Sequence, residues 1–115
     1  MKKLILIVAM ALVSSSVWGG VYIMGAGTIG CGEFVKERQE SDVMSDLYSQ
    51  WIMGFISAIN VRRNDENEDS VLGMDTETVS IELWLENYCR EHPLEKLYKA
   101  SKALIVELEE RESSQ

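Results

Sequence analysis

The sequence has few of the residues that catalytic and metal sites need. Its 115 residues include one histidine, His92, two cysteines, Cys31 and Cys89, and one proline, Pro93. A structural zinc site takes four nitrogen, sulfur or carboxylate ligands, and a hydrolytic triad needs a histidine in addition to its nucleophile. The G-x-S-x-G motif of serine hydrolases does not occur. We therefore expect no catalytic residue, no metal ion and no cofactor, in a protein that is not an enzyme.

Basic residues are also scarce. The chain has 11 lysines and arginines against 19 aspartates and glutamates, a formal net charge of −8. Without Lys2 and Lys3, 9 basic and 19 acidic residues remain, a net charge of about −10. A nucleic-acid-binding protein needs the opposite sign of charge, and a polybasic membrane patch is equally missing. The acidity is compatible with solubility alone, and it would also steer a basic protein partner towards the surface.

The first 19 residues have the pattern of a secretory signal peptide. Lys2 and Lys3 precede an unbroken apolar run, residues 4–13, and small polar residues follow. Val17 and Gly19 are the small residues that cleavage after Gly19 requires. An alternative is an uncleaved anchor, because no charge occurs between Lys3 and Glu33 and about 20 apolar residues span a bilayer. A lipoprotein signal ending at Cys31 fits poorly. Each alternative places the domain in the periplasm or otherwise outside the cytoplasm, and a cleaved signal leaves no stable membrane insertion.

Export determines what we expect of the cysteines. An oxidising compartment favours a Cys31–Cys89 disulfide, which closes a loop of roughly 60 residues and stabilises the fold by about 4 kcal/mol. Cys89 lies three residues before His92, within ENYCREHPL. Because Cys89 has this partner, we interpret the pair as a joint between two helices, in which Cys89 ends one helix and His92-Pro93 starts the next.

The hydrophobic periodicity predicts an all-α domain of three main helices and a possible short N-terminal one. A glycine-rich segment, residues 20–32, precedes a single helical domain, residues 33–110, and a frayed tail, residues 111–115. The short helix covers residues 33–39, with Phe34 and Val35 facing inward. The first main helix covers residues 41–60, with Ser41 as its cap and Gly54 allowing another helix to approach closely. Its predicted inward face, at helical spacing, is Met44, Leu47, Trp51, Phe55, Ala58 and Ile59.

Two further helices follow an exposed polar loop, residues 60–70. The first of them begins with Asp75 or Thr76 as its cap, and the second has Pro93 at its first helical position. In the first we expect Val79, Ile81, Leu83, Trp84, Leu85 and Tyr88 to be buried. In the second we expect Leu94, Leu97, Ser101, Leu104, Ile105 and Leu108 to share one face.

Two short motifs match binding sites by their letters. Residues 25–30, GAGTIG, fit the dinucleotide fingerprint, but no strand or crossover helix surrounds them, so we interpret the match as chance. Residues 65–69 place oxygens as an EF-hand loop does, but Ser70 and Thr76 replace the glycine and the bidentate glutamate that such a loop requires. We interpret this stretch as a solvated loop, with weak calcium binding by residues 65–76 as an alternative.

The order of features resembles two groups of small exported helical proteins. The features are Cys31-Gly32-Glu33-Phe34, the aromatic stretch from Trp51 to Ala58, and the stretch from Trp84 to Leu94. They resemble HdeA-type periplasmic acid-stress chaperones and the immunity proteins that neutralise type VI secretion amidase effectors. The resemblance implies a disulfide-stapled all-α scaffold. The asparagine that precedes the proline in those groups is His92 here.

Two functions follow as hypotheses. In the first, the protein is a non-enzymatic periplasmic inhibitor, immunity-like, whose exposed loop blocks a basic effector through Asp65, Glu66, Glu68 and Asp69. In the second, it is an acid-activated chaperone, in which low pH exposes apolar helix faces around Trp51, Phe55, Trp84 and Tyr88 to an unfolded client; otherwise these four form core. A tethered envelope module is a third alternative if the signal is uncleaved. A homodimer is possible, although no heptad or symmetric patch is evident in the sequence.

Overall fold

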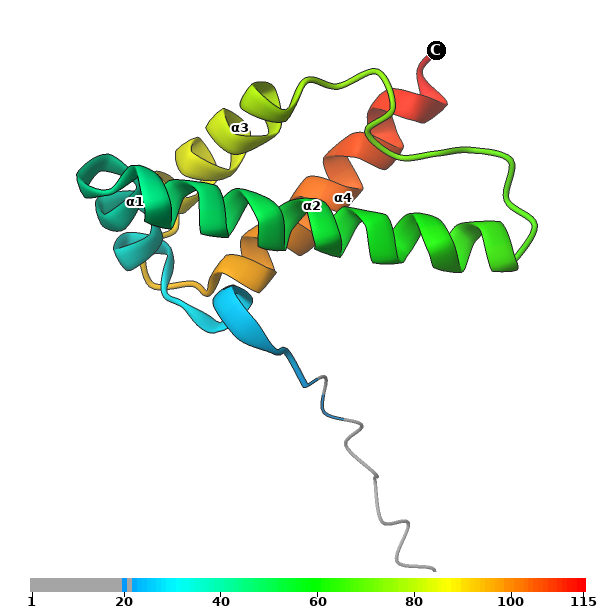
Figure 1. Ribbon diagram of the computed structural model, residues 1–115. Helices are drawn as coiled ribbons and strands as arrows, with labels where there is room; N and C mark the ends of the chain where they lie inside the picture. The colour runs from blue at the N-terminus through cyan, green and yellow to red at the C-terminus, as the bar shows by residue number, and fades with distance from the viewer. Residues whose placement is uncertain (1–19, 21) are drawn as a thin grey trace, which may run out of the picture.

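The computed structural model describes residue 20 and residues 22–115, and this part of the chain is helical without a strand. A short 3-10 helix, η1 (Gly25–Thr28), precedes four α-helices (Figure 1). They are α1 (Cys31–Glu40), α2 (Asp42–Asp65), α3 (Thr78–Glu91) and α4 (Leu97–Ser113). The prediction of an all-α fold with three main helices and one short helix is confirmed. The predicted signal peptide or anchor, residues 1–19, lies outside the described residues.

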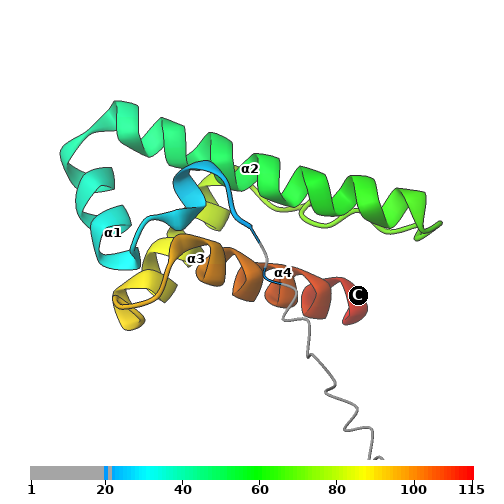
Figure 2. The same ribbon diagram turned by 90° about the horizontal axis from the view of Figure 1, so that it is seen from below.

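The long helix α2 covers one side of the core, and α3 and α4 cover the other (Figure 2). Helix α1 closes one end, where the predicted Cys31–Cys89 disulfide joins the start of α1 to the last turn of α3. Every helix contributes fully or almost fully buried apolar side chains to one core, among them Phe34, Ile52, Leu85 and Leu104. Among the described helices, none combines the length and the apolar character that crossing a bilayer requires.

Helix α2 begins as predicted but ends later. The Ser41 hydroxyl accepts a hydrogen bond from the Met44 backbone N–H at 3.2 Å, as an N-cap residue does. The helix then continues to Asp65, so the prediction of a loop from residue 60 is wrong for its first six residues. The added turn places Arg62 and Arg63 at the carboxyl end of the helix, where the helix dipole favours cations.

The inward face of α2 is rotated by about one residue from the predicted one. Tyr48, Ile52 and Ile56 are buried, whereas Leu47 is 50% exposed and Ala58 is exposed. Gly54 is exposed as well, and a Cβ atom built on it would meet no other atom within 4 Å. The prediction that Gly54 admits a close helix is therefore wrong.

Helices α3 and α4 begin later than predicted. Glu77 and Lys96 take the N-cap positions, so Asp75, Thr76 and Pro93 lie in connecting turns. In α3, Ile81 and Leu85 are buried as predicted, but Val79 and Leu83 are 63% and 57% exposed. In α4 the predicted face is buried from Leu97 onward, while Leu94 is 97% exposed. The helix continues to Ser113, into the segment predicted to fray.

The connector before α4 is fixed by the N-terminal segment, which explains the late start of that helix. The Cys31 N–H donates to the Glu95 carbonyl at 2.7 Å, and the Leu97 N–H donates to the Ile29 carbonyl at 2.9 Å. The Gly32 N–H donates to the Pro93 carbonyl at 3.2 Å. Residues 93–96 thus pair with residues 29–32 and are unavailable for a helical turn.

Candidate protein-binding surface

The carboxylates predicted to contact a partner lie at one end of the molecule, which we call the acidic end. It consists of the last turn of α2, the loop of residues 66–77 and the last two turns of α4. The loop leaves α2 and passes the C-terminal end of α4 before it reaches α3 (Figure 1). The acidic residues of these segments are Asp65, Glu66, Glu68, Asp69, Asp75, Glu77, Glu107, Glu109, Glu110 and Glu112.

Arg63 is the centre of the acidic end. Only 7% of this residue is exposed, which is rare for an arginine unless its charge is paired. Its guanidinium lies 3.0 Å from a carboxylate oxygen of Glu68, 3.1 Å from one of Glu112 and 3.8 Å from one of Glu109. It also donates to the Ser70 hydroxyl. One buried cation therefore holds the loop against α4.

A second contact fixes the middle of the loop. The Asn60 side-chain amide donates to the Leu72 carbonyl at 3.1 Å, and the Leu72 N–H donates to the Asn60 side-chain oxygen at 2.9 Å. This pair of hydrogen bonds satisfies both backbone polar groups of Leu72, whose side chain is buried in the core with 3% exposed. The loop is therefore attached to the protein at two separate points.

Two residues with positive φ turn the loop at its ends. Asn67 has φ of 59° directly after α2, a left-handed conformation that asparagine tolerates better than most residues. The Glu68 N–H then donates to the Arg63 carbonyl at 2.9 Å, which closes the end of the helix. Gly73 has φ of 76°, and its carbonyl accepts from the Thr76 N–H at 3.1 Å.

The four predicted partner-binding residues differ in their contacts. Asp65 and Asp69 are exposed, and Glu66 has only a 4.0 Å ion pair with Arg62 on the surface. Glu68 is paired with buried Arg63, so part of its charge serves the fold. The sequence pattern did not indicate Arg63, Glu109 and Glu112 as part of this surface. Glu109 and Glu112 are three residues apart, a spacing that places them on one face of a helix. The predicted end of the helical domain, residue 110, falls between them, so they were not recognised as a pair.

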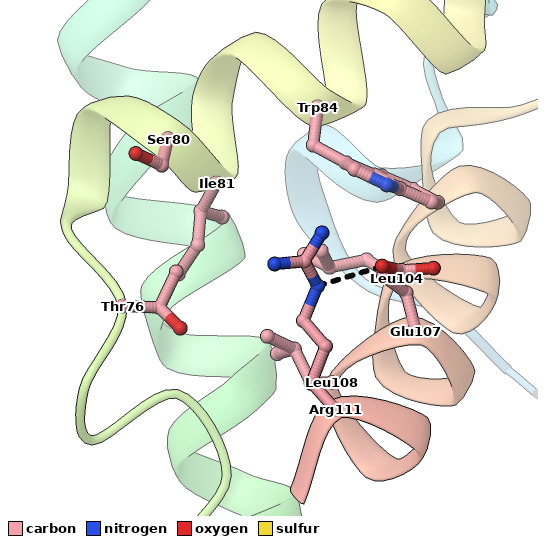
Figure 3. A pocket seen from close by; sticks show the side chains of 8 residues that line it. All are labelled: Thr76, Ser80, Ile81, Trp84, Leu104, Glu107, Leu108 and Arg111. Carbon is pink, nitrogen blue, oxygen red and sulfur yellow. Dashed lines mark hydrogen bonds and ion pairs between the residues drawn. The ribbon is translucent and has the colours of Figure 1, made fainter. Parts of the chain in front are cut away.

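Two hollows adjoin the acidic end. The larger, of about 310 Å³, lies between the loop and the end of α4. Its charged lining residues are Asp69, Asp75, Glu112 and Arg111, and Leu72 and Leu108 are apolar residues that line it. The smaller, of about 80 Å³, lies between α3 and α4 (Figure 3). The smaller hollow has apolar walls, and at its rim Arg111 donates to Glu107 at 2.6 Å.

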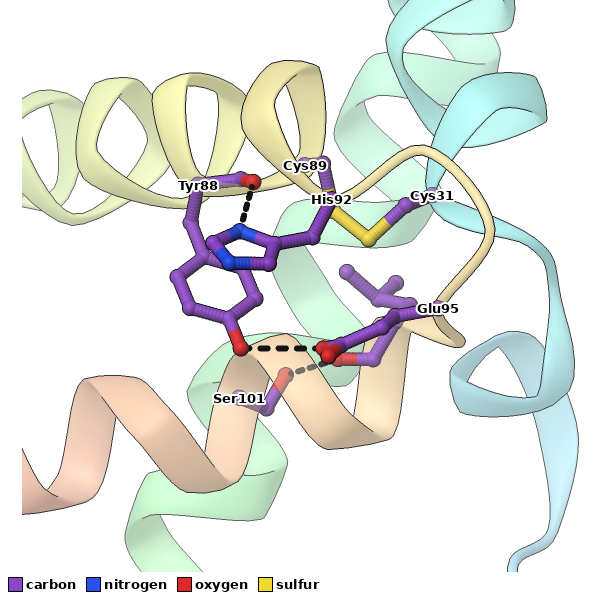
Figure 4. The surroundings of a disulfide bond; sticks show 7 residues. Cys31, Tyr88, Cys89, His92, Glu95 and Ser101 are labelled. Atoms are coloured by element: carbon purple, nitrogen blue, oxygen red, sulfur yellow. Dashed lines mark hydrogen bonds between the residues drawn. A yellow bond between two sulfur atoms is a disulfide. The ribbon is translucent and has the colours of Figure 1, made fainter.

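Cys89, His92 and the residues around them stabilise the fold (Figure 4). Both cysteines are fully buried in the disulfide, so neither is a free thiol. His92 is the C-cap of α3, with its Nδ1 2.9 Å from the Tyr88 carbonyl and its ring stacked on that of Tyr88 at 4.2 Å between centroids. The Tyr88 hydroxyl donates to Glu95 at 2.9 Å, and this hydrogen bond raises the pKa of Tyr88. The interpretation as a joint fits, although the next helix begins at Leu97 rather than at His92-Pro93.

The four aromatic residues singled out in the sequence form two stacked pairs. Trp51 stacks on Phe55 with 5.4 Å between ring centroids, and Trp84 stacks on Tyr88 with 5.5 Å. All four are partly buried and pack against the core. Each pair therefore has one side in the core and one side near the surface.

Trp51 explains two of the three glycines of the dinucleotide-like stretch, Gly25 and Gly27. A Cβ atom on Gly27 would lie 2.1 Å from the Trp51 ring, and the Trp51 indole N–H donates to the Met24 carbonyl at 2.9 Å. No strand precedes this stretch in the described residues, as the fingerprint requires.

In the described part of the chain, no three His, Cys, Asp or Glu side chains are placed to hold a metal ion. No protein-family model, no curated protein and no solved structure matches the chain.

Proposed function

We propose that the protein is a non-enzymatic inhibitor of the immunity type, exported to the periplasm, whose acidic end binds a basic site on another protein. The observation that carries the proposal is the ion-pair cluster of Arg63. It attaches the loop of residues 66–77 to α4, so the surface carboxylates are arranged before a partner arrives. Preorganisation reduces the entropic cost of binding, and clustered negative charge accelerates association with a basic surface.

The larger hollow supports the same proposal. Its apolar floor, formed by Leu72 and Leu108, suits the aliphatic stem of a lysine or arginine side chain. Of the charged residues that line it, Glu112 is paired with Arg63 and Arg111 with Glu107, which leaves Asp69 and Asp75 for the cationic head. A basic side chain projecting from the partner is therefore the group that we expect in this hollow.

The test is an association-rate measurement with purified type VI secretion amidase effectors of basic charge. We expect the triple variant Asp65→Asn, Glu66→Gln, Asp69→Asn to associate roughly tenfold more slowly, because it removes exposed charge but leaves Glu68 on Arg63. The matched control is Glu33→Gln, Glu40→Gln, Asp42→Asn, which removes three exposed carboxylates at the other end of the molecule. Equal association rates for the two triple variants would refute the role of the acidic end.

A second candidate function, an acid-activated chaperone, is favoured by the ion pairs that join helices. Arg38 of α1 lies 3.8 Å from both Glu82 and Glu86 of α3, and Arg63 of α2 is paired with α4. At low pH these carboxylates become protonated, and the net charge of residues 20–115 rises from about −10 towards about +10. Lost ion pairs and self-repulsion then loosen the helices and expose the apolar sides of Trp51 and Trp84.

A titration of the oxidised protein from pH 7 to pH 2 tests this second candidate. Near-ultraviolet dichroism reports tertiary packing, and light scattering of an aggregating client reports protection. Loss of the tertiary signal together with client protection supports the chaperone. A protein that stays folded, or that unfolds without protecting the client, contradicts it.

A further inference from the structure

The smaller hollow, between α3 and α4, opens to the surface although core residues line it (Figure 3). Ile81, Leu104 and Leu108 are among its lining residues, and all three are at most 5% exposed. The partly buried Trp84 lines the hollow as well. A concave site with apolar walls and a few polar groups is the usual form of a binding site.

The volume of the smaller hollow limits what can enter it. The volume is about 80 Å³. Because an apolar cavity of about 150 Å³ holds a benzene molecule, roughly half that volume suits a branched aliphatic group rather than an aromatic ring. The side chains of valine, leucine and isoleucine carry groups of this size.

The charges at the rim of the smaller hollow disfavour an anion. Arg111 donates to Glu107 at 2.6 Å, so its charge is already paired, and the neighbouring acidic end repels anions. The Arg111 side chain is 66% exposed, and an exposed ion pair within one helix contributes little to stability. Arg111 can therefore move aside at low cost when a side chain enters the hollow.

The smaller hollow is continuous with the larger one. Thr76, Leu108 and Arg111 line both of them. Apolar residues are also exposed nearby: Met74, which lines the larger hollow, is 74% exposed, and Val79 in the first turn of α3 is 63% exposed. Exposed apolar residues beside two adjoining hollows indicate one interaction surface.

We propose that the smaller hollow binds an aliphatic side chain of the same partner whose basic side chain occupies the larger hollow. This inference rests on the proposed function, because it adds a second contact to the same binding surface. Since the two hollows share lining residues, the basic and the aliphatic residue lie close together on the partner. Charge then determines how fast the partner associates, and the buried aliphatic group determines how slowly it dissociates.

A titration with isobutylamine tests the smaller hollow without an effector, because this probe joins a branched aliphatic group to a positive charge. Nuclear magnetic resonance of the isotope-labelled, oxidised protein should show shifts of the Trp84 indole N–H and of residues 104–111. We expect a dissociation constant on the order of 10 mM, because the probe has only five non-hydrogen atoms. Isovalerate, which carries a carboxylate on the same isobutyl group, should bind at least tenfold more weakly. An unshifted Trp84 signal at about 100 mM isobutylamine, or equal binding of both probes, overturns the proposal.

Thr76→Leu fills the smaller hollow from within. Thr76 lies directly before the N-cap residue Glu77, and Ile81 is the fourth residue of α3; Thr76 and Ile81 both line the hollow. A leucine at position 76 can pack against Ile81 as a hydrophobic staple, so we expect the variant to fold. The matched control is Thr78→Leu, the same exchange at an exposed residue that lines neither hollow. Only Thr76→Leu should abolish the shift of Trp84 with isobutylamine, and a shift that it leaves unchanged overturns the proposal.

Kinetics with a basic amidase effector separate this inference from the proposed function. Thr76→Leu changes no charge, so association should stay as in the wild type while dissociation accelerates roughly tenfold. Thr78→Leu should match the wild type in both rates. Unchanged dissociation of Thr76→Leu, with slower association of the triple charge variant, would overturn the aliphatic contact and support the acidic end. An effector that does not bind, despite a Trp84 shift with isobutylamine, would contradict the proposed function but not the class of group that the smaller hollow binds.

Discussion

Arg62 and Arg63 are neighbours in the sequence, but the structure gives them different roles. Arg62 lies on the surface, with 67% of its side chain exposed and a 4.0 Å ion pair to Glu66. Arg63 points inward, with 8% of its side chain exposed and three carboxylates around it. Exposed ion pairs contribute little to stability, whereas removing one member of a buried cluster leaves the others without compensation.

Arg63→Met is therefore expected to lower the free energy of unfolding by about 1–3 kcal/mol, because the carboxylates left behind are partly solvated. Arg62→Met should change it by less than about 0.5 kcal/mol. Urea denaturation measures both values, and hydrogen exchange of residues 66–72 should accelerate only in Arg63→Met. Equal effects of the two substitutions would contradict the anchoring role of Arg63.

Gly27 and Gly54 form a second contrast between single residues. A Cβ atom on Gly27 would collide with the Trp51 ring, whereas one on Gly54 would meet nothing. We expect Gly27→Ala to destabilise the fold by about 1–3 kcal/mol through overpacking. Gly54→Ala should stabilise it by about 1 kcal/mol through helix propensity. Thermal unfolding measures both changes, and shifts of the same sign would contradict the described packing of η1 on α2.

Tyr48 predicts a dependence of stability on alkaline pH. Burial raises the pKa of the Tyr48 hydroxyl, and its hydrogen bond to Glu37 and the charge of that carboxylate raise it further. An unfolded tyrosine loses its proton near pH 10, so above this pH the unfolded state binds fewer protons than the native state. Stability then falls as the pH rises, by up to about 1.4 kcal/mol per pH unit from this group. Between pH 9 and pH 11, Tyr48→Phe should lose less stability than the wild type, and equal losses in urea denaturation would count against this account.

At the scale of elements, the sequence predicts where helices lie better than which way they face. The buried face of α4 matches from Leu97 to Leu108 because only one side of that helix is apolar. Helix α2 is apolar on two sides, and periodicity alone favours neither, so Leu47 and Ala58 were assigned to the core and Tyr48 was not. The choice between the sides depends on contacts with α1 and α3. The Tyr48 hydroxyl donates to Glu37, and the Ser49 hydroxyl donates to Glu82.

The ends of the elements depend on contacts between segments distant in sequence. Helix α2 continues past Asn60 because Arg63 pairs with carboxylates of α4. One of them, Glu112, lies 49 residues later in the sequence. Helix α4 starts after Lys96 because residues 93–96 pair with residues 29–32. Capping rules consider only the residues around a helix end, so Asp75 and Pro93 gave the wrong starting points.

At the scale of the whole molecule, the sequence predicts one of the two segments that form the candidate site, the loop after α2, and misses the other, the end of α4. The acidity and the segment of residues 65–69 indicated an acidic binding surface. The structure adds that this segment meets the end of α4, so that carboxylates from two parts of the chain form one surface around Arg63. No local sequence pattern predicts this contact between the two segments, because it results from the packing of α2 against α4.

Hydrogen exchange of the complex with a bound amidase effector tests the central claim most directly, because it maps where the partner binds. The acidic end is the proposed binding surface, so binding should slow exchange in residues 62–77 and 107–113. Exchange in α1 and in the middle of α2 should stay unchanged. Slowed exchange confined to residues 31–40, or to residues 47–61, would contradict the account.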